Sequence, residues 1–105
     1  MNQMFGEYGR ALEQIAKPFI ESGIYASTDA FVSSLVKEVS ARKICEYEQK
    51  IKDFEAKHGS FDSFTQKIRG KASPKQEDQW MEWEASINML NAWKHVACEL
   101  DSLAS

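Results

Sequence analysis

The chain has 105 residues, of which 43% are hydrophobic and 28% are charged, and its formal net charge is −3. This composition is that of an ordinary soluble protein, and the length suits one domain with a modest core. No apolar run approaches the length of a membrane span, and residues 1–10 lack the basic and then apolar layout of a secretory signal. We therefore expect a single cytoplasmic domain over residues 1–105 that does not associate with membranes.

Charge is distributed unevenly along the chain. Residues 37–75 carry ten Lys and Arg against six Asp and Glu, whereas residues 76–105 carry one Lys against six acids. A basic segment can contact nucleic acid, but these lysines are interleaved with acids in the mixed pattern of a solvated helix face. The acidic end of the chain suits a basic protein partner.

The first half of the chain predicts two helices. Apolar residues recur at helical spacing from residue 5 to residue 20, and Gly23 is a suitable C-terminal stop. Pro18 lies inside that pattern and predicts a kink or a restart of the helix, because proline lacks an amide donor. Ser27 or Thr28 then caps a second helix over about residues 29–57, the longest one, whose apolar face shifts near residues 40–42.

The second half predicts two more helices. Ser60 can cap a short third helix that stops at Gly70. Ser73, Pro74 and Gln76 form a capping box at the start of the fourth helix. The apolar positions of this fourth helix, which carries all three tryptophans, are Trp80, Trp83, Ile87, Leu90, Trp93, Ala97 and Leu100. The sequence thus predicts an all-α fold of four helical segments, with one long central helix and a long C-terminal amphipathic helix, in a dimeric helical bundle.

Residues suited to catalysis or metal binding are few. The chain lacks the motifs of nucleotide-binding proteins, hydrolases and zinc proteases, and it has two histidines. His58 follows Glu55 in a single E-x-x-H pair, whereas di-iron bundles need two such pairs. His95 and Glu99 are spaced for a surface ion pair. We therefore predict no enzyme activity, no catalytic residue, no metal site and no cofactor.

The two cysteines are isolated in the sequence. Cys45 and Cys98 are not spaced like zinc ligands and form no C-x-x-C motif. Free, packed thiols are the expected state, and a disulfide between them is the alternative. Neither cysteine enters a predicted site.

One segment resembles a known family. Residues 21–37 read ESGIYASTDAFVSSLVK. They resemble the junction between the two helices of ribbon-helix-helix antitoxins from bacterial and archaeal toxin–antitoxin modules, which follows a pattern like E-S-G-x-Y-x-S-x-S-E-h-h-R-x-A-h-R. Such antitoxins dimerise through this unit, hold DNA phosphates at the start of the second helix and wrap a helical tail around the toxin. They read DNA with a short N-terminal strand, whereas residues 1–6 carry no basic residue.

The resemblance and the tryptophan pattern together imply three sets of functional residues. The dimer core would be Phe31, Val32, Leu35 and Val36. The phosphate-facing turn would be Ser27, Thr28 and Asp29. The residues that bind a partner protein would be Trp80, Trp83, Ile87, Leu90 and Trp93.

Two functions follow from these observations. In the first, the chain is an antitoxin-like homodimer: residues 1–37 form a dimerising hairpin that can also contact DNA, and residues 38–105 form a helical tail that covers a cognate toxin protein. In the second, the tryptophans are internal, and the chain is a self-contained structural helical bundle with no dedicated ligand. The exposure of the tryptophans in the free chain distinguishes the two.

Overall fold

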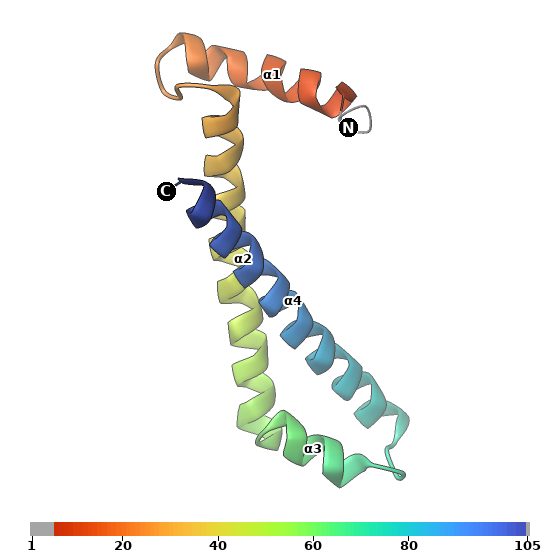
Figure 1. The fold of residues 1–105 in the computed structure, drawn as a ribbon. Coiled ribbons are helices and arrows are strands. Elements are labelled where there is room, and N and C mark those ends of the chain that lie inside the picture. Colours follow the sequence, from red (N-terminus) through yellow and green to blue (C-terminus); the bar gives the residue numbers. More distant parts are fainter. Residues whose placement is uncertain (1–5, 105) are drawn as a thin grey trace. The chain divides into compact units, whose positions relative to one another are not determined.

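The computed structural model describes residues 6–104, and all the regular structure in that range is helical (Figure 1). The helices are, in chain order, α1 (Gly6–Glu21), α2 (Thr28–His58), α3 (Phe61–Ile68) and α4 (Pro74–Ala104). This confirms the predicted all-α fold with four helical segments. Residue 5, the first apolar position of the predicted first helix, lies outside the described residues.

Serine side chains cap the helices where the sequence predicts caps. The Ala30 amide donates to Ser27 Oγ at 3.1 Å, so Ser27 rather than Thr28 is the N-cap of α2. Ser60 caps α3 in the same way, because its Oγ accepts from the Ser63 amide at 3.1 Å. Each cap satisfies one of the amides that a helix start leaves without an intrahelical partner.

The start of α4 is a complete capping box. The Gln76 amide donates to Ser73 Oγ at 3.2 Å, and the Ser73 amide donates to Gln76 Oε1 at 3.0 Å. Both donors of the reciprocal arrangement are therefore satisfied, as predicted.

Loss of this cap should weaken the fold measurably. The substitution Ser73→Ala is expected to lower the free energy of unfolding by about 1 kcal/mol, because an amide loses its acceptor. Urea denaturation followed by far-UV circular dichroism measures the change. Ser102→Ala is the control, since Ser102 is exposed in the last turn of the same helix. Equal midpoints for the two variants would show that the capping box contributes nothing.

Pro18 does not restart the first helix. The sequence predicts a kink or a restart at Pro18, and the restart is wrong because α1 runs through Pro18 as one helix (Figure 1). Pro18 lies near the C-terminal end, and the backbone beyond it is well bonded: the Ser22 amide donates to the Pro18 carbonyl at 3.1 Å. The helix then ends with Gly23 in the left-handed region, at φ 81°, where glycine meets no Cβ penalty.

The chain divides into two compact units, residues 1–39 (unit 1) and residues 40–105 (unit 2). The division falls within α2, close to the residues at which the apolar face of the predicted helix shifts. Unit 1 contains α1 and the first part of α2, and unit 2 contains the rest of α2 with α3 and α4. Each unit has its own small apolar core.

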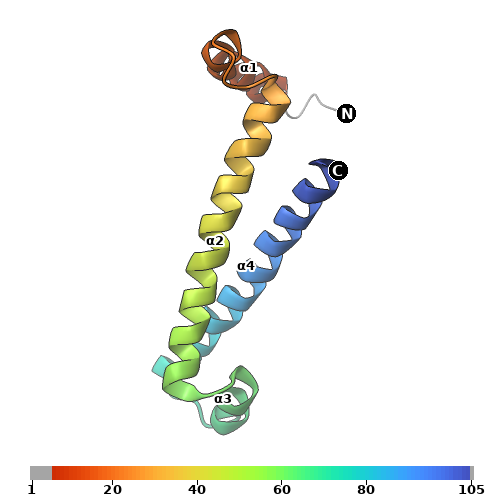
Figure 2. The same ribbon diagram turned by 90° about the vertical axis from the view of Figure 1, so that its left-hand side faces the viewer.

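The core of unit 2 forms where α3 lies across the ends of α2 and α4 (Figures 1 and 2). Its buried members are Phe64 and Ile68 from α3 and Trp83 from α4. Residues packed against them are Ile51, Phe54, Phe61, Ala72, Trp80 and Ile87. The amphipathic pattern of α3 explains this arrangement, because residues four apart on a helix share a face.

Candidate protein-interaction surfaces

Three aromatic rings form the core of unit 1. Phe31 stacks on Phe19 with ring centroids 5.3 Å apart, and Tyr25 meets Phe31 edge-on at 5.4 Å. The Tyr25 hydroxyl also lies 3.3 Å from Ser34 Oγ. Phe31 and Ala16 are the buried apolar residues among the described part of this unit.

The predicted dimer core is divided by this arrangement. Phe31 lies inside unit 1 and is covered by its own chain. Val32 and Val36 are half-buried, and Leu35 is exposed. Of these four residues, one is enclosed by its own chain and three are accessible.

The apolar residues of α1 form one continuous arc around the helix. Ala16 is buried, and Leu12 and Ile20 are half-buried, which marks the side turned inwards. Tyr8, Ile15 and Phe19 lie along the outer edge of the same arc and are 72%, 56% and 39% exposed, although the Phe19 ring also stacks on Phe31.

The predicted phosphate-facing turn is already occupied by its own cap. Ser27 Oγ accepts from the Ala30 amide, and the Ser27 carbonyl accepts from the Phe31 amide at 3.1 Å. Asp29 is exposed in the first turn of α2. A carboxylate there interacts favourably with the positive end of the helix dipole, but it repels a phosphate.

The three tryptophans have different environments within unit 2. Trp83 is fully buried: it stacks on Phe54 at 5.2 Å with an interplanar angle of 8°, and its buried Nε1 has no hydrogen-bond partner. Trp80 is half-buried, and its Nε1 donates to Thr65 Oγ1 at 2.8 Å. Trp93 is half-buried and lies outside the core cluster. A partner can therefore reach Trp80 and Trp93, but not Trp83 unless the core opens.

The rest of the predicted partner-binding face is only partly covered. Ile87 packs against the core, and Leu90 is half-buried. No apolar side chain from residue 87 to residue 103 is buried in this structure. The core of unit 2 is thus confined to the end of the helices that α3 covers.

An apolar groove lies between α3 and α4. It has a volume of about 260 Å³ and is lined by Ile68, Glu77, Trp80 and Met81. We call it the α3/α4 groove. Its lining is apolar apart from Glu77, and Met81 is 62% exposed. The sequence analysis missed Ile68 and Met81, because the groove joins two helices that only the fold brings together.

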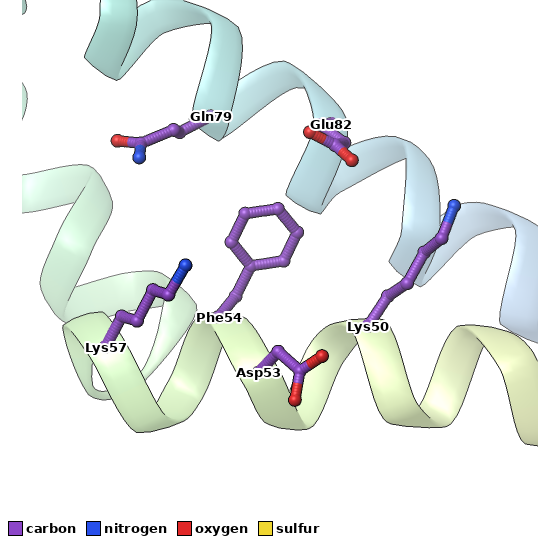
Figure 3. A pocket seen from close by; sticks show the side chains of 6 residues that line it. All are labelled: Lys50, Asp53, Phe54, Lys57, Gln79 and Glu82. Carbon is purple, nitrogen blue, oxygen red and sulfur yellow. The ribbon is translucent and has the colours of Figure 1, made fainter.

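A second cleft of about 270 Å³ lies between α2 and α4 of unit 2 (Figure 3). The Phe54 ring occupies its middle, Lys50 and Lys57 flank it on α2, and Gln79 and Glu82 face it from α4. Asp53 also lines the cleft. Because both signs of charge are present, the lining does not select a ligand class.

The histidines and cysteines do not gather into a site. Among the described residues, no three His, Cys, Asp or Glu side chains come close enough to hold a metal ion. His58 packs on the Phe64 ring at 4.5 Å, and His95 Nε2 lies 3.8 Å from Glu99 Oε1, as predicted for a surface pair. Cys45 and Cys98 are free but exposed. The expectation that these thiols are packed is wrong, because both cysteines are exposed and lie outside the core cluster.

Comparison with known proteins adds no relative. No family model matches the chain, and neither a curated protein nor a solved structure matches it. None of the helices in the described part of the chain is long and apolar enough to cross a membrane. The functional conclusion therefore rests on the surfaces themselves.

Proposed function

We propose that the chain is a non-catalytic protein-interaction module of antitoxin type, which binds a partner protein through its helical C-terminal region. The observation that carries this proposal is the α3/α4 groove, where Met81 is exposed beside the half-buried Trp80. Methionine and tryptophan supply adaptable and rigid contact surface, respectively, and both are enriched where proteins bind each other.

The charge around the groove suggests the chemistry of the partner. Glu77 lines the groove, and the exposed Glu84 lies seven residues further along α4 on the same side of the helix. Acidic side chains beside an apolar anchor complement a basic surface that presents one apolar side chain. The partner in this proposal is accordingly a small basic protein, as a cognate toxin would be.

Contacts within unit 2 fix the side chain of Trp80 at the groove. Its Nε1 donates to Thr65 Oγ1, and Thr65 Oγ1 donates in turn to the Phe61 carbonyl at 2.8 Å. The Trp80 ring also stacks on Phe61 with centroids 5.6 Å apart. A side chain fixed in this way loses little conformational entropy when a partner binds.

The remaining features of the antitoxin-like proposal are a cytoplasmic homodimer and a long helical bundle. The resemblance of residues 21–37 supports the homodimer. Two features oppose DNA binding at the first hairpin: Ser27 Oγ already accepts from an amide at the start of α2, and the Asp29 carboxylate repels a phosphate. One observation favours a self-contained structural bundle as a second candidate: Trp83 is buried by its own chain.

Binding of a small basic protein tests the proposal, and small basic proteins encoded by the neighbouring genes are the first candidates. Isothermal calorimetry with the full chain should show binding, and Met81→Glu should weaken it at least tenfold by placing a charge in the apolar groove. Met89→Glu is the matched control, because Met89 lies on the same helix, is 40% exposed and does not line the groove. No binding by any such product, or equal affinity for the two variants, would favour the structural bundle.

A further inference from the structure

The turn between α3 and α4 concentrates positive charge. Lys and Arg make up 13 of the 105 residues, whereas four of the nine residues 67–75 are Lys or Arg. The alternation of acids and lysines earlier in the basic segment ends at Asp62, and residues 63–76 contain no Asp or Glu. We call these four cations the basic turn; they are Lys67, Arg69, Lys71 and Lys75.

The cations of the basic turn have no partner among the described residues. All four side chains are exposed, and none forms an ion pair or a side-chain hydrogen bond with another described residue. The next acid along the chain is Glu77, which lines the α3/α4 groove. Lys75 lies in the first turn of α4, at the positive end of the helix dipole, where a cation is unfavourable. Contacts within the fold therefore do not account for these charges.

Hydrogen bonds fix the backbone that carries the basic turn. The Arg69 amide donates to the Gln66 carbonyl at 3.4 Å, and the Lys71 amide donates to the Ile68 carbonyl at 3.0 Å. The capping box of α4 follows directly. Four positive charges are thus held on a short fixed segment where α3 joins α4 (Figure 1). A negatively charged partner can bind them without ordering the backbone first.

We propose that the basic turn binds the phosphate backbone of a duplex nucleic acid, without regard to base sequence. Duplex phosphates are closely spaced charges that Lys and Arg side chains neutralise, with release of counterions. Proteins that bind single strands stack the bases on aromatic side chains, and residues 67–75 contain no aromatic residue. Contacts to phosphates alone position a protein on a duplex but carry no sequence information.

The surroundings of the basic turn favour a nucleic acid over other anionic partners. A protein interface needs an apolar centre, but Ile68 is buried and Ala72 is half-buried. The same lack of an exposed apolar side chain between residues 67 and 75 leaves nothing to enter a lipid surface. Charge without an apolar anchor is typical of surfaces that bind a phosphate backbone.

The basic turn is a different surface from the one in the proposed function. None of its four residues lines the α3/α4 groove, and a small basic protein would be repelled by them. It is also distinct from the predicted phosphate-facing turn at Ser27, Thr28 and Asp29, which belongs to unit 1. The inference therefore does not depend on binding of a protein at the groove.

Fluorescence anisotropy with the full chain tests this inference. We expect binding to two short duplex DNAs of unrelated sequence with equal affinity, and binding should weaken steeply between about 50 and 200 mM salt. The double variant Arg69→Gln with Lys71→Gln should bind at least about tenfold more weakly at the lower salt concentration, and its slope of log K against log salt should be shallower by about 2. A duplex RNA of the same sequence shows whether the phosphates of DNA or of RNA are preferred, and binding of either supports the inference.

Two double variants serve as controls. Arg42→Gln with Lys52→Gln removes the same charges from exposed positions of α2 and should leave the salt slope unchanged. Arg69→Lys with Lys71→Arg conserves the charge of the basic turn and should bind as the wild type does. No binding to any duplex, or equal slopes for the two glutamine variants, would overturn the inference. Binding to phosphatidylserine vesicles but not to a duplex would also overturn it and assign the basic turn to a membrane surface. No titration contains the small basic protein, so these results are independent of the proposed function.

Discussion

Replacing Trp83 with alanine is expected to lower the free energy of unfolding by about 3–5 kcal/mol, the largest effect of any single substitution in unit 2. Trp83 is fully buried and contacts the rings of Phe54, Phe61 and Phe64, at centroid distances of 5.2, 5.2 and 5.6 Å. Its removal leaves a cavity at the point where α2, α3 and α4 meet. Urea denaturation followed at 222 nm measures the loss.

Two further variants serve as controls for Trp83→Ala. Trp83→Phe should cost much less, because it retains a ring and removes an indole Nε1 that is buried without a hydrogen-bond partner. Trp93→Ala should also cost less, since Trp93 is half-buried outside the core cluster. If Trp83→Ala unfolded at the urea concentration of the wild type, the core described for unit 2 would be wrong.

Phe31→Ala is the second substitution expected to have a large effect, and its effect should be confined to unit 1. Phe31 lies between Phe19 and Tyr25, and alanine would remove the contacts that hold α1 to α2. We expect a loss of about 3–5 kcal/mol for that unit, enough to abolish its independent stability. Amide hydrogen exchange should then show that α1 loses its protection.

The tryptophans report whether unit 2 responds to this change. All three lie in unit 2, so their emission should be the same in Phe31→Ala as in the wild type. Phe61→Ala is the matched comparison, because it removes the same ring from a site that contacts Trp80 and Trp83. A shift of the tryptophan emission in Phe31→Ala would contradict the division of the chain into two separate units.

Helix boundaries could be predicted from the sequence because short-range chemistry determines them. Ser27, Ser60 and Ser73 each accept from an amide three residues ahead, and this interaction needs no distant residue. Gly59 and Gly70 adopt φ values of 79° and 74° near the ends of α2 and α3. Such left-handed positions favour glycine wherever they occur.

The partners of each apolar face could not be predicted in the same way. Trp80 and Trp83 belong to one stripe, yet Trp83 is enclosed and Trp80 borders a groove. Both contact α3, but Trp83 also stacks on Phe54 of α2. In α1, neighbouring residues Ile15 and Ala16 face different surroundings, and the small residue is the buried one. Periodicity identifies an apolar face but does not indicate which element covers it.

The lining of the α3/α4 groove could not be predicted from the sequence either. Met81 was one residue in a predicted helix, and Ile68 was one in another, with no sequence signal that they line a common groove. Their association depends on the turn between α3 and α4, where the Lys71 amide donates to the Ile68 carbonyl at 3.0 Å. Of the residues that the tryptophan pattern predicts to bind a partner, Trp80 lines this groove, whereas Met81 is not among them.

The most direct measurement of the central claim follows the methionine methyl groups of the full chain by NMR during titration with each small basic protein that the neighbouring genes encode. We expect the Met81 methyl signal to shift and saturate at one partner per chain, while the Met89 methyl signal stays unchanged, because Met81 lines the α3/α4 groove and Met89 does not. A titration in which Met81 is unaffected, or in which Met89 responds alone, would contradict the assignment of this chain as an interaction module that binds through the groove.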